Sequence, residues 1–143
     1  MVAKSIPWNP VFEMGIVEMD DDHRGLVRMI NTFLEVVDND EGLIAMDEIF
    51  RGLIDYTLYH FDREERMMAE AGFGGLEGHH LAHLSLKNRV GILRDLYLSR
   101  PGCEAEAEIH RFLSDWLTNH IMKMDMQYRD AILASRGLLL KSA

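Results

Sequence analysis

Seven histidines stand out in this sequence of 143 residues, and five of them recur in register with apolar residues at helical spacing. His79 and His83 are four residues apart, so both rings lie on one face of a helix. His60 is followed four residues later by Glu64, which places an imidazole and a carboxylate together. The five histidines on expected inward faces are His23, His60, His79, His83 and His120.

A single histidine on an inward face is usually a core residue satisfied by a hydrogen bond. That explanation does not extend to five, because each buried polar group without a partner costs several kcal/mol, roughly 2–7. One partner that binds all of the rings is the simpler explanation, and a metal is such a partner.

Two carboxylates belong to this candidate site. Glu64 shares a face with His60, whereas Asp62 and Glu65 point elsewhere on an ideal helix. Asp125 follows His120 by five residues, about 140° away on an ideal α-helix. Asp125 is therefore either a solvated surface acid or a ligand that needs a local deformation of the helix.

Five imidazoles and two carboxylates are too many ligands for one ion and suit two. Imidazole binds iron, copper, zinc and nickel, and carboxylates favour harder ions, so the mixture indicates a dinuclear iron site. The ferritin-like di-iron proteins differ from this pattern, because they use Glu-x-x-His pairs and more carboxylates.

Four segments with helical periodicity must position these residues. We expect helices over about 20–38, 44–71, 77–98 and 104–135, separated by short stretches that contain glycine, asparagine or proline. Gly72 follows the second segment, at a place where glycine commonly ends a helix.

Short connections make sequence neighbours antiparallel. The pattern predicts an all-α fold, an antiparallel up-down-up-down four-helix bundle with an extended N-terminal arm. We expect a single domain with an arm over 1–18, a bundle over 19–135 and a short tail over 136–143, in which Leu138–Leu140 pack back on the bundle.

Taken together, these motifs resemble the hemerythrins, most closely the single-domain bacterial hemerythrins. The matching pieces run from about residue 8 to 130: Trp8 and Gly15 in the arm, Asp20-Asp21-Asp22-His23, His60-Phe61-Asp62-Arg63-Glu64-Glu65, His79-x-x-x-His83, and Trp116-Leu117-Thr118-Asn119-His120-Ile121-x-x-x-Asp125. Each motif alone is weakly specific, but all four in this order are highly specific.

The resemblance implies two irons and assigns a set of ligands to each. His79, His83 and His120 would hold one iron that is coordinatively full, and His23 and His60 would hold the other, which keeps one position open. Glu64 and Asp125 would bridge the two non-haem irons together with an oxo or hydroxo group. Leu117 and Ile121 would line the oxygen pocket and exclude water.

The function implied is reversible dioxygen binding for carriage, storage or delivery, without catalytic residues and without enzyme activity. Two alternatives use the same centre: an oxygen sensor or regulatory partner, and a di-iron enzyme that handles peroxide or nitric oxide. An oxygen-consuming protein is a conceivable partner, and we expect the chain to be a monomer.

One position departs from the family, which commonly has a glutamine immediately before the first ligand histidine. Here that residue is Asp22. An added negative charge there could favour ferric iron, but we interpret Asp22 as a solvated residue of an acidic helix start. We also expect His80 and His110 to be exposed bystanders and Cys103 to be an incidental thiol.

The charge balance excludes other functions. Twenty-four acidic and 15 basic residues give a net charge of −9, which would repel nucleic acid and anionic membranes. We expect no membrane insertion, because no apolar stretch approaches the roughly 18 residues of a span. A single cysteine and the lack of an apolar leader predict a cytoplasmic protein.

Overall fold

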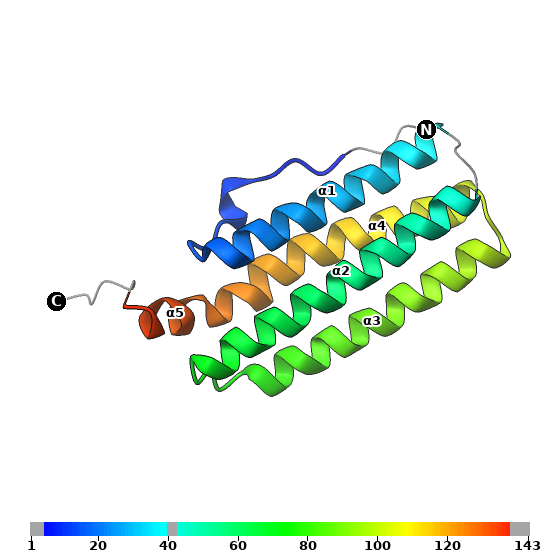
Figure 1. The fold of residues 1–143 in the computed structure, drawn as a ribbon. Coiled ribbons are helices and arrows are strands. Elements are labelled where there is room, and N and C mark those ends of the chain that lie inside the picture. Colours follow the sequence, from blue (N-terminus) through cyan, green and yellow to red (C-terminus); the bar gives the residue numbers. More distant parts are fainter. Residues whose placement is uncertain (1–4, 40–42, 138–143) are drawn as a thin grey trace.

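The computed structural model describes residues 5–39 and 43–137, and in these ranges every regular element is a helix. Four long helices lie side by side: α1 (Val17–Asn39), α2 (Leu43–Glu70), α3 (Leu76–Ser99) and α4 (Cys103–Asn119) (Figure 1). Contacts join α1 to α2, α2 to α3, α3 to α4 and α4 back to α1, which closes the bundle. The predicted all-α bundle is confirmed.

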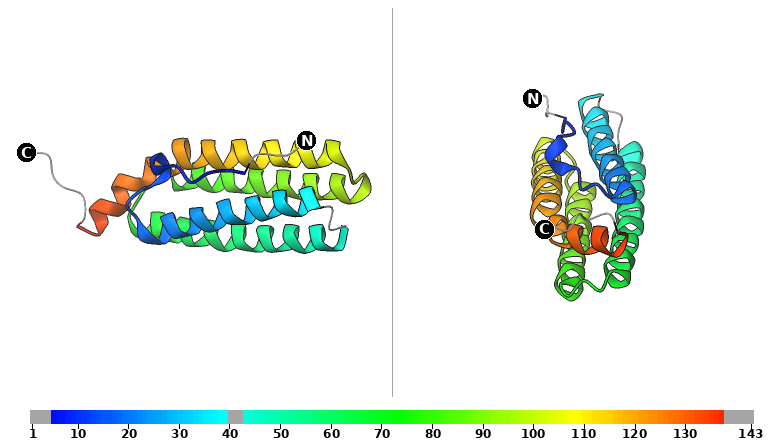
Figure 2. Two further views of the ribbon diagram at one scale, coloured as in Figure 1. Left: turned by 90° about the horizontal axis from the view of Figure 1, so that it is seen from above. Right: turned by 90° about the vertical axis from the view of Figure 1, so that its left-hand side faces the viewer.

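The last predicted helix is in fact three consecutive elements. After α4 the chain continues as a π-helical turn, η2 (His120–Asp125), and then as α5 (Met126–Ser135). Figure 2 shows α5 crossing the end of the bundle instead of continuing along it. The expected packing of Leu138–Leu140 falls outside the described residues.

The N-terminal arm runs over the bundle and is tied to it by hydrogen bonds. It contains one short 3-10 turn, η1 (Pro10–Phe12), and then joins α1, which begins at Val17, within the range expected for the arm. Asp20 fixes the junction, because its two carboxylate oxygens accept the backbone N–H groups of Met14 (2.8 Å) and Gly15 (3.1 Å). Gly15 has a φ of 80°, a conformation that glycine adopts without strain.

Gly72 ends α2 as the sequence predicts. Its φ is 70°, and the N–H of Phe73 donates to the carbonyl of Met68 at 3.0 Å. This arrangement is a Schellman-type helix end. It allows α3 to return antiparallel to α2 after a short loop.

The two largest apolar clusters of the described residues fill the bundle at different heights. The larger one contains Leu26, Leu53, Leu93 and Leu117, and the other contains Met19, Met68, Tyr128 and the arm residues Met14 and Ile16. On α1, α2 and the α4–α5 segment, the predicted site residues fall between the members of these clusters. Among the described residues, no helix is long and apolar enough to cross a membrane.

Candidate metal centre

Seven buried polar side chains meet between the two apolar clusters. Each of them is at most 7 % exposed. They are the seven predicted ligands: His23, His60, Glu64, His79, His83, His120 and Asp125. Residues from four helical segments far apart in the sequence therefore meet in one place.

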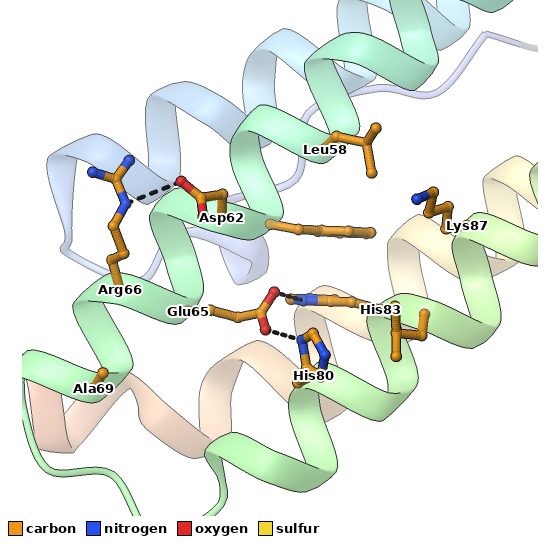
Figure 3. Close-up of a pocket in the computed structure, with 10 residues that line it drawn as sticks. Leu58, Asp62, Glu65, Arg66, Ala69, His80, His83 and Lys87 are labelled. Carbon is orange, nitrogen blue, oxygen red and sulfur yellow. Dashed lines mark hydrogen bonds and ion pairs between the residues drawn. The ribbon is translucent and has the colours of Figure 1, made fainter.

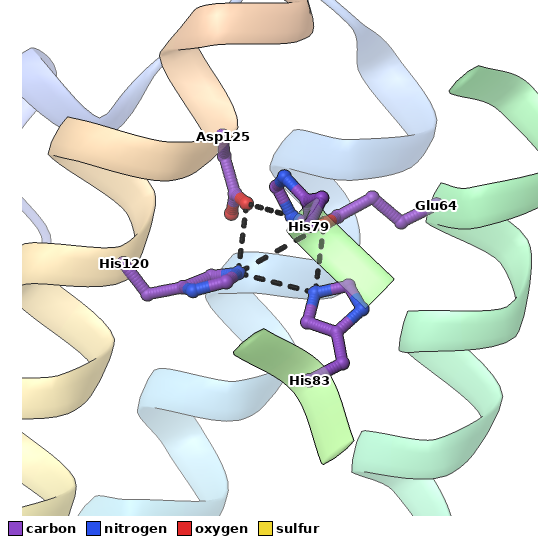
Figure 4. A group of neighbouring side chains, drawn as sticks. All are labelled: Glu64, His79, His83, His120 and Asp125. Atoms are coloured by element: carbon purple, nitrogen blue, oxygen red, sulfur yellow. Dashed lines mark hydrogen bonds and ion pairs between the residues drawn. The ribbon is translucent and has the colours of Figure 1, made fainter. Parts of the chain in front are cut away.

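Their nitrogen and oxygen atoms form two groups. One group comprises Glu64, His79, His83, His120 and Asp125 (Figure 4), and the other comprises His23, His60, Glu64 and Asp125. Within each group the candidate ligand atoms lie within 4.8 Å of one another. Only Glu64 and Asp125 belong to both.

The three-histidine group is built around one oxygen of each carboxylate. Oε1 of Glu64 lies 2.6 Å from Nε2 of His79 and 3.2 Å from Nε2 of His83. Oδ1 of Asp125 lies 2.9 Å from Nε2 of His120. The Nε2 atoms of His83 and His120 are themselves 3.2 Å apart, so all three rings turn the same nitrogen inward.

The two-histidine group uses the other oxygen of each carboxylate. Oε2 of Glu64 lies 2.9 Å from Nε2 of His60, and Oδ2 of Asp125 lies 3.0 Å from Nε2 of His23. Each carboxylate therefore presents one oxygen to each group of imidazoles.

Several of these atoms lack ordinary partners. Both oxygens of Asp125, Oε2 of Glu64 and both ring nitrogens of His23 are buried without a hydrogen-bond partner. Ligands about 2.1 Å from a common ion and at right angles to each other lie about 3 Å apart, close to most of the spacings found here. Buried polar atoms without partners are costly, so the donor set fits metal ions better than it fits a hydrogen-bonded core.

The π turn explains how Asp125 joins His120. They are five positions apart, and on an α-helix Asp125 would face about 140° away. η2 spans exactly these residues, and its wider turn brings both side chains to the same face. The helix therefore has the local deformation that a ligand role for Asp125 requires. The alternative, a solvated surface acid, is wrong because Asp125 is fully buried.

The buried charges also control protonation. Burial disfavours the charged form of His60. The charge of Glu64 and the hydrogen bond with Asp22 outweigh burial, with a smaller contribution from Asp125, and raise the pKa of His60 to about 9. Burial likewise disfavours the charged form of His120. The charge of the neighbouring Asp125 outweighs burial and raises the pKa of His120 to about 10. The cationic rings in turn overcome burial and lower the pKa of both carboxyls.

Asp22 corrects an expectation from the sequence. It was expected to be solvated, but it is 5 % exposed and its Oδ2 lies 3.0 Å from Nδ1 of His60. The prediction failed because a helical pattern shows which face of α1 Asp22 occupies but not that a ring of α2 covers it.

Glu65 makes a contact that the sequence did not predict. As expected, it does not join the group that contains His60. Its Oε2 lies 3.2 Å from Nδ1 of His83 on the neighbouring helix, and it also pairs with His80 (Figure 3). These residues line a surface hollow of about 350 Å³ between α2 and α3. The sequence carries no signal for this contact, because it depends on how the two helices pack.

Aromatic rings cover the three-histidine group. Phe61 stacks on His83 with centroids 3.7 Å apart and planes 5° apart. Trp116 lies against both Phe61 (6.0 Å) and His120 (5.6 Å). On the side of α5, Tyr128 lies 5.4 Å from His79. This shell keeps water from three of the five imidazoles.

The predicted pocket residues Leu117 and Ile121 are buried, at 2 % and 1 % exposed. Both belong to the larger apolar cluster, together with Leu26 and Val27, which follow His23 by one turn. The apolar cluster thus ends beside the two-histidine group.

The bystander residues lie outside both groups. His80 is exposed as predicted, with half of its side-chain surface accessible. The expectation for His110 is wrong, because it is only partly exposed. The side chain of Cys103 is not among those described.

Comparison with known proteins gives a consistent result. Residues 14–132 match the family model of the hemerythrin HHE cation binding domain. Over 134 residues the chain is 34% identical to a bacteriohemerythrin of Pseudomonas paraeruginosa, covering 94% of this chain and 86% of the relative. A bacteriohemerythrin of Clostridium acetobutylicum is 28% identical over 126 residues (86% of this chain, 98% of the relative). A myohemerythrin of Riftia pachyptila is 29% identical over 122 residues (85% and 89%).

Proposed function

Because the chain belongs to the hemerythrin family, we propose that it binds dioxygen reversibly at two non-haem irons held by its seven buried ligands. The proposal assigns it to oxygen carriage, storage or delivery in the cytoplasm. One observation carries it: Glu64 and Asp125 each turn one oxygen toward the three-histidine group and the other toward the two-histidine group.

The unequal number of imidazoles gives the two ions different tasks. His79, His83 and His120 would hold one iron, and His23 and His60 would hold the other, with Glu64 and Asp125 bridging them beside a solvent-derived oxo or hydroxo group. Because His23 and His60 supply one imidazole fewer, an iron held by them would be the one with room for dioxygen. When bound, the two irons would supply the binding position for dioxygen and the electrons that are transferred to it.

The protein's own contribution is to hold the ligands and exclude water. The neutral imidazoles bring no negative charge, so the ferric state is less favoured than in a carboxylate-rich site. Leu117 and Ile121, both buried in the apolar cluster that also contains Leu26 and Val27, keep protons and water from the oxygen position. Premature release of reduced oxygen is thereby slowed.

Metal analysis and oxygen cycling test the proposal. We expect two irons per chain after loading with ferrous iron. Air added to the reduced, loaded protein should produce a new visible absorption band that disappears under argon and returns with air. A protein that loads no iron, or whose spectrum does not reverse over repeated cycles, would contradict the proposal.

Two variants serve as a matched pair. His60→Ala should lose iron, because it removes one of two imidazoles from its group. His110→Ala should keep both irons and the reversible band, because His110 lies outside both groups. Equal iron content in the two variants would remove His60 from the ligand set.

Further experiments separate carriage from the alternatives. A di-iron enzyme would turn over hydrogen peroxide or nitric oxide many times and faster than free iron does, and we expect no such turnover. A sensor would capture a protein partner only in one oxygenation state. We expect neither result for a carrier that acts alone.

A further inference from the structure

Asp22 lies directly behind His60. Its Oδ2 is 3.0 Å from Nδ1 of His60, while Nε2 of the same ring lies 2.9 Å from Oε2 of Glu64. Asp22 is 5 % exposed and His60 is 1 % exposed, so solvent does not compete for either end of the ring. The imidazole is thus held between an outer carboxylate on α1 and an inner carboxylate on its own helix.

Asp22 is itself held in place from α2. The guanidinium of Arg63 lies 3.6 Å from its other oxygen, Oδ1. The hydroxyl of Tyr56 donates to its backbone carbonyl at 3.1 Å, and Arg63 donates to the hydroxyl of Tyr59 at 3.1 Å. A buried carboxylate with these neighbours cannot leave His60 without breaking contacts between the two helices.

The other imidazole of this group has no such support. Nδ1 of His23 is buried without a hydrogen-bond partner. In the other group, Glu65 contacts Nδ1 of His83, but it also pairs with the half-exposed His80 at the surface hollow. Asp22 therefore acts on the two-histidine group alone and from a more buried position.

We propose that Asp22 is a positioning residue that fixes His60 with its proton on Nδ1, aims Nε2 at the metal, and favours the oxidised state of the ion that His60 binds. A carboxylate that accepts the outer N–H of a ligand imidazole fixes its tautomer and orientation and strengthens its bond to the metal. Its negative charge stabilises the more positive oxidation state of a nearby ion. This inference rests on the proposed function, because it needs iron at the site.

The test compares Asp22→Asn and Asp22→Ala with the unchanged chain and with Asp21→Asn. Asparagine keeps an acceptor oxygen but removes the charge, and alanine removes both. Asp21 is the matched control, because it precedes Asp22, is 68% exposed and pairs only loosely with Arg24, at 3.8 Å. Three quantities are measured: chelator-driven release of ferrous iron, the midpoint potential of the loaded protein, and thermal unfolding of the metal-free protein.

We expect Asp22→Ala to release iron about 10–100 times faster than the unchanged chain, the range typical of lost outer partners of metal ligands. Asp22→Asn should release iron less rapidly than Asp22→Ala but should have a higher midpoint potential and slower oxidation in air. A tenfold change in preference between oxidation states corresponds to about 59 mV for one electron. Asp21→Asn should match the unchanged chain in all three measurements.

The inference is overturned if Asp22→Asn loads two irons with an unchanged potential. It is also overturned if Asp21→Asn raises the potential as much as Asp22→Asn does, or if iron release tracks only a lower unfolding temperature of the metal-free protein. A parent chain that binds no iron contradicts the proposed function instead, so the two failures are distinguishable.

Discussion

Oδ1 of Asp125 lies 2.9 Å from Nε2 of His120, although the two are five positions apart along the chain. On an α-helix that separation would turn the carboxylate away from the imidazole. The π-helical turn His120–Asp125 makes the contact, and π turns inside α-helices commonly occur at functional sites. The turn is also the point from which α5 departs across the end of the bundle (Figure 2).

The π turn predicts an unusual tolerance to a deletion. Removing the exposed Lys123 leaves His120 and Asp125 four positions apart, so an ordinary α-helix would keep both side chains on one face. We expect this variant to load two irons and to be as stable as the unchanged chain.

A deletion in the regular part of the same helix is the control. Without the exposed Asp115, the part of the helix after the deletion turns by about 100° relative to the part before it. The ligands that follow the deletion therefore leave the site. We expect that variant to lose iron. Loss of iron in the Lys123 deletion, measured by metal analysis, would show that the wide turn itself is needed.

Much of the candidate site could be predicted from the sequence because its ligands follow helical periodicity. His79 and His83, or His60 and Glu64, share a face at a spacing of four on any straight helix, and both pairs do meet in the structure. The helical bundle itself was equally predictable, since its apolar stripes and short loops leave few other arrangements.

The contacts between helices were not predictable in this way. Asp22 and Glu65 belong to α1 and α2, but they meet rings on α2 and α3. Their positions depend on the rotation and depth of each helix against its neighbour, which periodicity within one helix does not contain. The π turn was visible only as a conflict, since Asp125 fitted the ligand set but not the α-helical spacing.

Asp20 should be important for stability and not for metal binding. Its carboxylate accepts two backbone N–H groups of the arm, from Met14 and Gly15, and it is 8 % exposed. Asp20→Asn leaves one acceptor oxygen and turns an amide NH₂ toward the second donor, which should cost about 1–3 kcal/mol. Urea unfolding of the iron-loaded protein measures the loss.

The neighbouring Asp21→Asn is the control for Asp20, since its side chain is 68% exposed. It should change the free energy of unfolding by less than about 0.5 kcal/mol. Similar unfolding midpoints for the two variants would show that the arm is not anchored through Asp20.

The metal-free protein should become less stable as the pH rises. The pKa of His60 is raised to about 9 and that of His120 to about 10, whereas both rings return to the ordinary value of about 6.5 on unfolding. Groups with a raised pKa in the folded state contribute stability that is complete below about pH 6.5 and disappears as the pH passes 9–10. Urea midpoints of the metal-free chain should therefore fall over this interval.

The iron-loaded protein should not show this slope, because its imidazoles must be neutral to bind metal. Loading at pH 7 should accordingly release protons, which a weakly buffered titration detects. If the free energy of unfolding of the metal-free protein stays flat or rises between pH 6.5 and 9, the pKa of His60 is not raised to about 9.

Leu117 should protect the bound oxygen, and Leu113 provides its matched control. Both are 2 % exposed, belong to the same apolar cluster and lie one turn apart on α4, but Leu117 is the nearer to His120. Replacing either by alanine should lower the free energy of unfolding by about 2–5 kcal/mol, since each change leaves a comparable cavity. Only Leu117→Ala should shorten the lifetime of the oxygen-bound form, because its cavity would admit water beside the two-histidine group. The half-life of the visible band in air, followed for both iron-loaded variants, separates the roles, and equal half-lives would assign Leu117 to packing alone.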